Sequence, residues 1–92
     1  MTAVHRDGDS RECSALTTVT GQSTVFVNGV LAAVEGDPET HGQGLLISTS
    51  AGTVLVEGKK LIVTSDSAGS DSADHPAPPT DPQSGSPTVN AY

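Results

Sequence analysis

Residues 24–37 read T-V-F-V-N-G-V-L-A-A-V-E-G-D, and residues 53–66 read T-V-L-V-E-G-K-K-L-I-V-T-S-D. The two stretches share the skeleton Thr-Val-x-Val-x-Gly, followed by an apolar stretch with Val and then by Asp. Each shared position recurs after 29 residues. The matched pairs are Thr24 with Thr53, Val27 with Val56, Gly29 with Gly58, Val34 with Val63, and Asp37 with Asp66. An internal repeat of this length predicts a fold assembled from copies of one small supersecondary unit.

Each copy has the pattern of a β-hairpin. Residues 25–27 form a short β-branched and aromatic run, Asn28-Gly29 is a strong signal for a two-residue turn, and residues 30–34 form the return strand. Glu57-Gly58 takes the turn position in the second copy. No stretch has apolar residues at the i, i+3, i+4 spacing of an amphipathic helix. The sequence therefore predicts an all-β fold with no significant helix.

A third copy is divided between the two ends of the chain. Residues 85–92 supply a first arm, and residues 3–9 supply a second arm whose Gly8-Asp9 matches Gly36-Asp37 at an offset of 28 residues. We expect Thr88 to Ala91 to pair with Ala3 to Arg6 and to close a pseudo-threefold ring, which leaves few free strand edges. The chain is then a single domain, residues 1–92, with units at roughly 21–49, 50–84, and 85–92 completed by 1–20.

The composition leaves little material for a hydrophobic core. Hydrophobic residues make up 34% of the 92 residues, with one Phe, one Tyr and no Trp. A chain of this size buries only about 60–65% of the surface that it exposes when unfolded. A partner chain, a metal or ring closure must therefore add stability. The alternative is a largely disordered chain, which ten Gly, six Pro and a net charge of −7 favour and the clustering of the apolar residues opposes.

The charge balance excludes one class of partner. Four Lys and Arg residues against eleven Asp and Glu residues cannot form the positive surface that nucleic-acid binding requires. No apolar run approaches the ~18 residues of a membrane helix, and the polar N-terminus is not a signal peptide. We expect a soluble protein that is made in the cytoplasm. A single cysteine, Cys13, excludes an internal disulfide framework.

Potential metal ligands follow Gly-Asp at matched positions of the repeat. Cys13 and His41 both complete the pattern G-D-x-x-x-ligand, after Gly8-Asp9 and Gly36-Asp37 respectively. The third unit has a serine at the equivalent place, but its longer connection ends in His75. Because equivalent positions surround one axis in a pseudo-threefold fold, we expect these three side chains to converge.

His5 completes a set of one cysteine and three histidines. This inventory suits a tetrahedral zinc ion, and iron is possible. The metal ligands that we predict are Cys13, His41, His75 and His5, and Asp9, Asp37 and Asp74 are substitutes for the fourth place. A closed four-ligand site leaves no open position for water, so the zinc would be structural. No nucleophile motif and no phosphate-binding loop occur, so we expect that the protein is not an enzyme and takes no small-molecule substrate.

The hairpin units and the G-D-x-x-x-H-G step resemble the PAAR-repeat proteins over nearly the whole chain. The family signature is Pro-Ala-Ala-Arg before Gly-Asp and after an Asn-Gly turn. Residues 25–37 occupy that place, with Leu31 for the Pro and Val34 for the Arg. The family's Gly-Ser-Pro-Thr-Val stretch is intact at residues 85–89 and altered at residues 22–25.

The resemblance implies a short cone with a zinc near its tip, bound by three His and one Cys. The broad base of such a cone docks on the blunt end of a trimeric β-helical spike, one cap per trimer, in a phage tail or a type VI secretion system. The expected location is therefore the virion, at the tip of the central spike, or the secreted spike. The cap would touch the target membrane during injection. Because the repeats use the whole length, we expect no toxin extension, which favours a phage tail slightly.

A carrier or binding module is the competing class. Lipoyl-like domains are also small, acidic and built from repeated hairpins, with a modified lysine at a hairpin tip. Lys59 or Lys60, after Glu57-Gly58, would be that lysine. The threefold repeat and the Cys and His set argue against this alternative, and an intact mass would reveal a covalent adduct.

Overall fold

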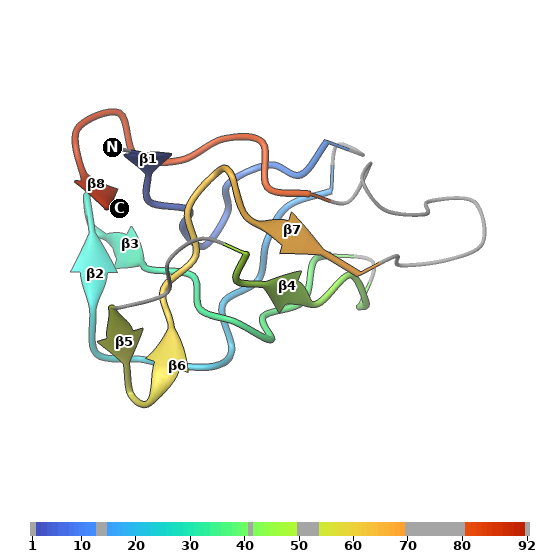
Figure 1. Ribbon diagram of the computed structural model, residues 1–92, viewed down its shortest axis with the longest axis horizontal. Helices are drawn as coiled ribbons and strands as arrows, with labels where there is room; N and C mark the ends of the chain where they lie inside the picture. The colour runs from blue at the N-terminus through green and yellow to red at the C-terminus, as the bar shows by residue number, and fades with distance from the viewer. Residues whose placement is uncertain (1, 13–14, 41, 50–53, 70–80, 92) are drawn as a thin grey trace.

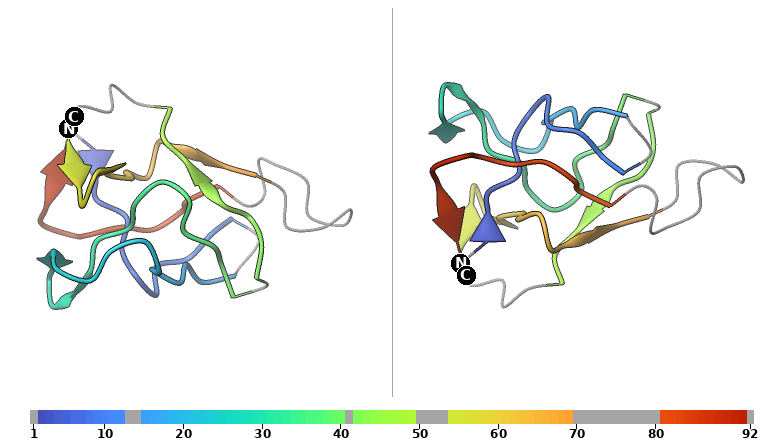
Figure 2. Two further views of the ribbon diagram at one scale, coloured as in Figure 1. Left: turned by 90° about the horizontal axis from the view of Figure 1, so that it is seen from below. Right: turned by 90° about the horizontal axis from the view of Figure 1, so that it is seen from above.

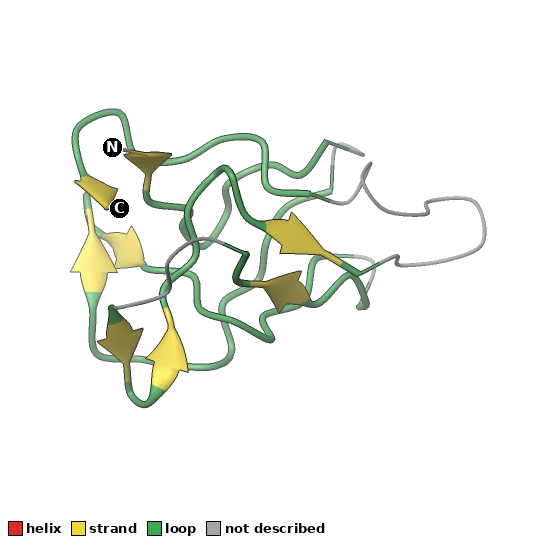
Figure 3. Cartoon of the chain, in the orientation of Figure 1, coloured by secondary structure: helices red, strands yellow, loops and turns green. Residues whose placement is uncertain are grey.

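The computed structural model describes residues 2–12, 15–40, 42–49, 54–69 and 81–91. These residues form short strands, turns and loops, and none of them is helical (Figure 3). The predicted all-β class is therefore confirmed for the described part of the chain. Within it we find no helix that could span a membrane. The strands are β1 (Thr2–Ala3), β2 (Phe26–Val27), β3 (Val30–Leu31), β4 (Leu46–Ile47), β5 (Leu55–Val56), β6 (Lys59–Lys60), β7 (Ser67–Ala68) and β8 (Asn90–Ala91).

Two hairpins form where the repeat predicts them. β2 pairs with β3, and β5 pairs with β6, both antiparallel. The turn residues have positive φ angles in both hairpins: 55° and 85° at Asn28 and Gly29, and 51° and 83° at Glu57 and Gly58. Positive φ at both central residues defines the type I′ turn, whose twist suits a two-residue hairpin. Glu57 adopts this conformation although it has a side chain.

The third hairpin joins the two ends of the chain. β1 pairs with β8, with Thr2 opposite Ala91 and Ala3 opposite Asn90, and the ends lie side by side in Figure 1. The predicted pairing is confirmed, but it stops earlier than expected. The last contact is the Val4 amide on the Val89 carbonyl, at 3.1 Å, and Arg6 bridges to Ala32 instead. The N-terminal arm leaves its hairpin at this point because its next residues pair with the neighbouring units.

The three units are joined by a cyclic set of backbone hydrogen bonds. The Ala33 amide donates to the His5 carbonyl, the Ile62 amide to the Ala33 carbonyl, and the His5 amide to the Ile62 carbonyl, at 2.9, 3.0 and 3.0 Å. A second cycle lies beside the first: its bonds are Asp7 amide to Leu31 carbonyl, Glu35 amide to Lys60 carbonyl, and Thr64 amide to Ala3 carbonyl. Each unit therefore contacts both others through equivalent residues, which gives the ring pseudo-threefold symmetry.

The core inside this ring is built from small side chains. One cluster is formed by Val4, Ala32, Val34, Val56 and Leu61, and the other by Val19, Ala33, Leu46, Ile62 and Ala68. The single Phe, Phe26, is exposed, so no described aromatic ring contributes to either cluster. Valine and alanine bury little apolar area, and the backbone ladder must supply much of the order.

A buried aspartate closes each unit with the same hydrogen bond. One carboxylate oxygen of Asp9, Asp37 and Asp66 accepts from the amide of Arg6, Val34 and Val63 respectively, at 2.9 Å in all three. Asp37 also accepts from the Thr20 and Gly21 amides, at 3.0 and 2.7 Å. These carboxylates act as turn residues, so two of the substitute ligands, Asp9 and Asp37, already have backbone partners. Asp74 lies outside the described residues.

Candidate metal centre and docking face

Three of the four predicted ligands, Cys13, His41 and His75, lie outside the described residues. The structure does describe the segments that lead to them. Each segment leaves the ring directly after a buried aspartate. The first returns at Thr17, whose amide donates to the Asp9 carbonyl at 2.9 Å. The second returns at Leu46, whose amide donates to the Asp37 carbonyl at 3.0 Å.

The chain neighbours of the predicted ligands are joined to one another. The Thr40 amide, next to His41 in the chain, donates to the Leu16 carbonyl at 2.8 Å. The Glu12 amide, next to Cys13 in the chain, donates to the Asp81 carbonyl at 2.9 Å. Asp81 directly follows residues 70–80, which contain His75. Backbone hydrogen bonds therefore connect the first of the three segments to both of the others. We name these segments, residues 10–16, 38–45 and 67–81, the ligand loops.

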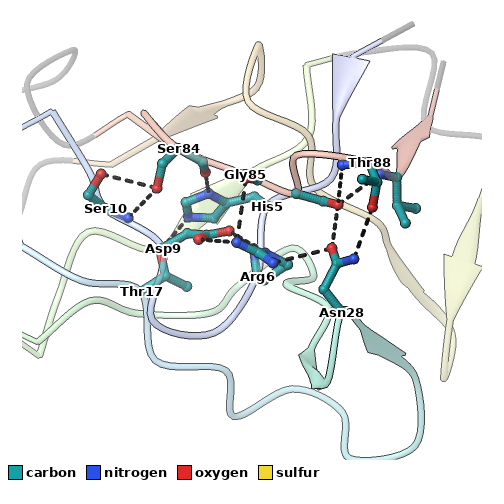
Figure 4. Close-up of polar contacts among 11 residues, drawn as sticks. His5, Arg6, Asp9, Ser10, Thr17, Asn28, Ser84, Gly85 and Thr88 are labelled. Carbon is teal, nitrogen blue, oxygen red and sulfur yellow. Dashed lines mark hydrogen bonds and ion pairs between the residues drawn. The ribbon is translucent and has the colours of Figure 1, made fainter.

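His5 lies inside the ring and is fully buried. Its Nδ1 is 2.6 Å from the Ser84 carbonyl oxygen, and its Nε2 is 2.6 Å from Thr17 Oγ1 (Figure 4). A carbonyl oxygen can only accept, so Nδ1 carries the proton and donates. Arg11 Nε donates to the same Thr17 oxygen at 2.6 Å, and the Thr17 hydroxyl is then free to donate to Nε2. These bonds describe a neutral imidazole with both nitrogens engaged.

Burial lowers the pKa of the His5 imidazole from 6.5 to about 4, because the charged form would lose its hydration. The Ser84 carbonyl and Asp9 oppose this shift, and Arg11 and Arg6 reinforce it. Within the fold, the Nε2 lone pair is directed at Thr17, so His5 could ligate a metal only by giving up that hydrogen bond. Among the described residues, no three His, Cys, Asp or Glu side chains form a metal-binding cluster.

A buried ion pair at the base of the ligand loops is a feature that the sequence analysis did not predict. Arg11 Nη1 lies 3.6 Å from Glu39 Oε2, and both side chains are inaccessible to solvent. The signal was present in the repeat: Arg11 lies two residues after Asp9, and Glu39 lies two residues after Asp37. Opposite charges at matched positions of a pseudo-threefold fold face each other across the axis.

The junction of the two chain ends carries a second polar network (Figure 4). Arg6 forms an ion pair with Asp9, with Nε and Nη2 at 2.9 Å from the two carboxylate oxygens, and its Nη1 donates to Asn28 Oδ1 at 3.2 Å. Asn28 Nδ2 donates to Thr88 Oγ1 at 3.0 Å, and Ser86 donates to Asn28 Oδ1. The turn of the first hairpin thereby connects both arms of the divided unit.

The three hairpins gather at one end of the long axis, on the left in Figure 1, with the ends of the chain beside them. Figure 2 shows the same grouping from two further directions. Their first arms expose apolar side chains at equivalent positions. Phe26 and Leu55 are 61% and 60% exposed, and Asn90 takes this position in the divided unit. The next set is formed by Val25, Val54 and Val89, which are also exposed. We name this surface, formed by these six residues, the base.

The lysines of the alternative carrier function do not lie at a hairpin tip. Lys59 and Lys60 are exposed residues of β6, opposite Val56 and Leu55. The tip itself is Glu57-Gly58, and the Glu57 carboxylate accepts from the Ser23 amide and the Thr24 hydroxyl of the preceding unit. These bonds hold the pKa of Glu57 below its usual value.

Comparison with known proteins gives no assignment: no protein-family model matches the chain, and no curated protein matches its sequence.

Proposed function

We propose that this protein is a structural cap for the central spike of a contractile injection machine, in a phage tail or a type VI secretion system. The observation that carries the proposal is the base. Three valines repeat there around the pseudo-threefold axis, and two of the three flanking positions hold large exposed apolar side chains. An exposed apolar patch of this kind marks an interaction site. A single chain with three equivalent contacts fits a partner that is itself threefold.

A trimeric β-helical spike has the properties that such a base would recognise. Its blunt end presents three identical strand ends, and main-chain pairing with exposed strands is a common mode of recognition. Docking would also bury Phe26 and Leu55, which are exposed in the isolated chain. Burying each of these side chains contributes about 1.5–3 kcal/mol, which this small core lacks.

In the proposed cap, Cys13, His41 and His75 bind a structural zinc near the tip, with His5 as the fourth ligand only if it leaves Thr17. The support is the matched spacing of Cys13 and His41 and the hydrogen bonds between the ligand loops. A zinc in such a site would supply rigidity without a large core. Iron would suit the same donors. The rigid tip would help the spike to pierce the target envelope.

Light scattering of the chain mixed with a purified trimeric β-helical spike tests the docking. We expect one chain per three spike subunits. The double variant Phe26→Asp/Leu55→Asp should abolish the complex, because it places two charges at the apolar contact. The matched control is Ile47→Asp, since Ile47 is also an exposed apolar strand residue but lies in β4, outside the base. A stable homotrimer of this chain that ignores the spike would contradict the proposal.

A further inference from the structure

The Arg11 side chain connects the first two ligand loops. Its Nη1 donates to the Gly44 carbonyl at 2.7 Å, and its Nη2 donates to the Asp37 carbonyl at 3.3 Å. Its ion pair with Glu39 lies in the same loop as Gly44. Both side chains are buried, so these contacts replace hydration and are not screened by solvent. One guanidinium therefore fixes the start, the middle and the end of the second ligand loop.

The third ligand loop meets Arg11 through the backbone. Arg11 forms an isolated antiparallel bridge with Pro82, directly after this loop, and the Glu12 amide donates to the Asp81 carbonyl. The Arg11 amide itself donates to the Ala15 carbonyl at 2.7 Å, across the first loop. Arg11 is thus the described residue at which all three ligand loops meet.

Gly44 leaves room for the ion pair. A Cβ atom added at Gly44 would lie 2.9 Å from Glu39 Oε2 and 3.0 Å from Glu39 Cδ. Gly44 also has a φ angle of +69°, which favours glycine. The backbone of the second ligand loop is therefore packed directly against the carboxylate that faces Arg11.

Stability alone does not explain a buried pair of this kind. Removing two charges from water costs several kcal/mol per ion, and well-packed apolar residues of similar volume are often as stabilising. A planar guanidinium instead defines direction, because its N–H groups form a rigid fork. The repeat gives this direction a purpose. Cys13 lies two residues after Arg11, and His41 lies two residues after Glu39.

We propose that Arg11 is the positioning residue of the metal centre: its guanidinium, paired with Glu39, sets the ligand loops in register so that Cys13 and His41 meet at one point. This inference rests on the proposed zinc centre and is independent of docking at the base. Groups that orient metal ligands without touching the metal typically change metal affinity 10–100-fold.

The test compares zinc affinity with folding in the double variant Arg11→Met/Glu39→Leu. This change removes both charges together, so neither is left buried without its partner. We expect the ring to persist, seen as hydrogen-exchange protection of the His5, Ala33 and Ile62 amides. Competition with a chromophoric chelator should show zinc affinity reduced by about 10–100-fold. A folded double variant with wild-type zinc affinity would overturn the proposal.

A pair of glycine variants tests the proposal even if the double variant does not fold. Gly44→Ala and Gly36→Ala both force alanine to a positive φ angle, but only the first brings a methyl group against Glu39. We expect Gly44→Ala to weaken zinc binding clearly more than Gly36→Ala. Equal affinities in the two variants would overturn the role of the ion pair.

The wild-type chain separates this inference from the proposed metal centre and from the proposed cap. If it binds one zinc and Cys13→Ser abolishes binding, the variants then test Arg11 alone. If it binds no zinc, both the centre and the role of Arg11 fall. Docking on the spike is scored separately, because the base lies outside the ligand loops.

Discussion

Thr2 lies opposite Ala91 in the same antiparallel register in which Val30 lies opposite Val27. The two ends of the chain therefore meet as the two arms of a hairpin, and the gap between them corresponds to the Asn28-Gly29 turn. The ring is complete only when this contact forms, because the Val4 amide also requires the Val89 carbonyl. The first two predictions concern this contact.

Deletion of residues 87–92 should destabilise the fold severely. It removes β8, the Val4–Val89 hydrogen bond and the Thr88 contact with Asn28. Each lost hydrogen bond costs about 0.5–1.5 kcal/mol, against a total stability of roughly 5–10 kcal/mol for so small a domain. Thermal unfolding followed by circular dichroism measures the loss. Asn90→Ala is the control, since it keeps the backbone ladder. An unchanged melting temperature after truncation would show that the ends do not close the ring.

A circular permutant should fold to the same structure. Ala91 is joined to Thr2 by Asn-Gly in place of residues 92 and 1, and the chain is opened between Asn28 and Gly29. The new turn has the residues that a type I′ hairpin requires, and the new ends lie at an equivalent position of the ring. We expect a native-like NMR spectrum. Opening the chain between Gly36 and Asp37 should be far more damaging, because it disrupts a buried turn. If both permutants fold equally well, the units are not equivalent in the way the hydrogen bonds indicate.

The hairpins could be predicted from the sequence because their signals are local. Asn28-Gly29 specifies its own turn, and the repeat transfers that turn to Glu57-Gly58. The two backbone cycles could not be predicted, because they depend on which carbonyl of another unit meets each amide. The divided unit shows the difference. Pairing of the ends followed from the repeat, but its early stop at Val4 follows from the ring.

The role of His5 was also open to a closer reading of the repeat. At an offset of 28 residues His5 corresponds to Ala33, and Ala33 corresponds to Ile62. Two apolar residues at equivalent positions indicate an interior place, so a buried histidine there needs internal hydrogen bonds. The sequence analysis weighed His5 by its donor chemistry alone. Its partners, Thr17 and the Ser84 carbonyl, come from segments that no local signal joins.

Asp37→Asn should cost about 3 kcal/mol or more of the free energy of unfolding. The carboxylate accepts from three backbone amides, of Val34, Thr20 and Gly21, and the side chain is fully buried. Hydrogen bonds to a charged group contribute about 1.5–3 kcal/mol each, and an amide nitrogen would face backbone donors. Urea unfolding measures the change. Glu35→Gln, at an exposed position of the same turn, should change stability little. Similar losses in the two variants would refute the turn role of Asp37.

The last prediction concerns pH. The pKa of His5 is about 4 in the folded protein, against 6.5 for an ordinary histidine. Above pH 6.5 the imidazole is neutral in both states and has no effect on pH dependence. Between pH 6.5 and 4 the unfolded chain binds a proton that the folded chain does not, so stability falls as the pH falls. The loss from this residue should reach about 3 kcal/mol near pH 4.

His5→Gln isolates this contribution, because glutamine keeps one donor and one acceptor but does not titrate. Free energies of unfolding are measured by urea titration at several pH values for both proteins. Contributions from the other histidines and from the carboxylates are common to both and cancel in the difference. We expect wild type to lose about 3 kcal/mol more than the variant between pH 6.5 and 4. Parallel curves would mean that His5 is not buried as a neutral imidazole, and its hydrogen bonds to Ser84 and Thr17 would then need another explanation.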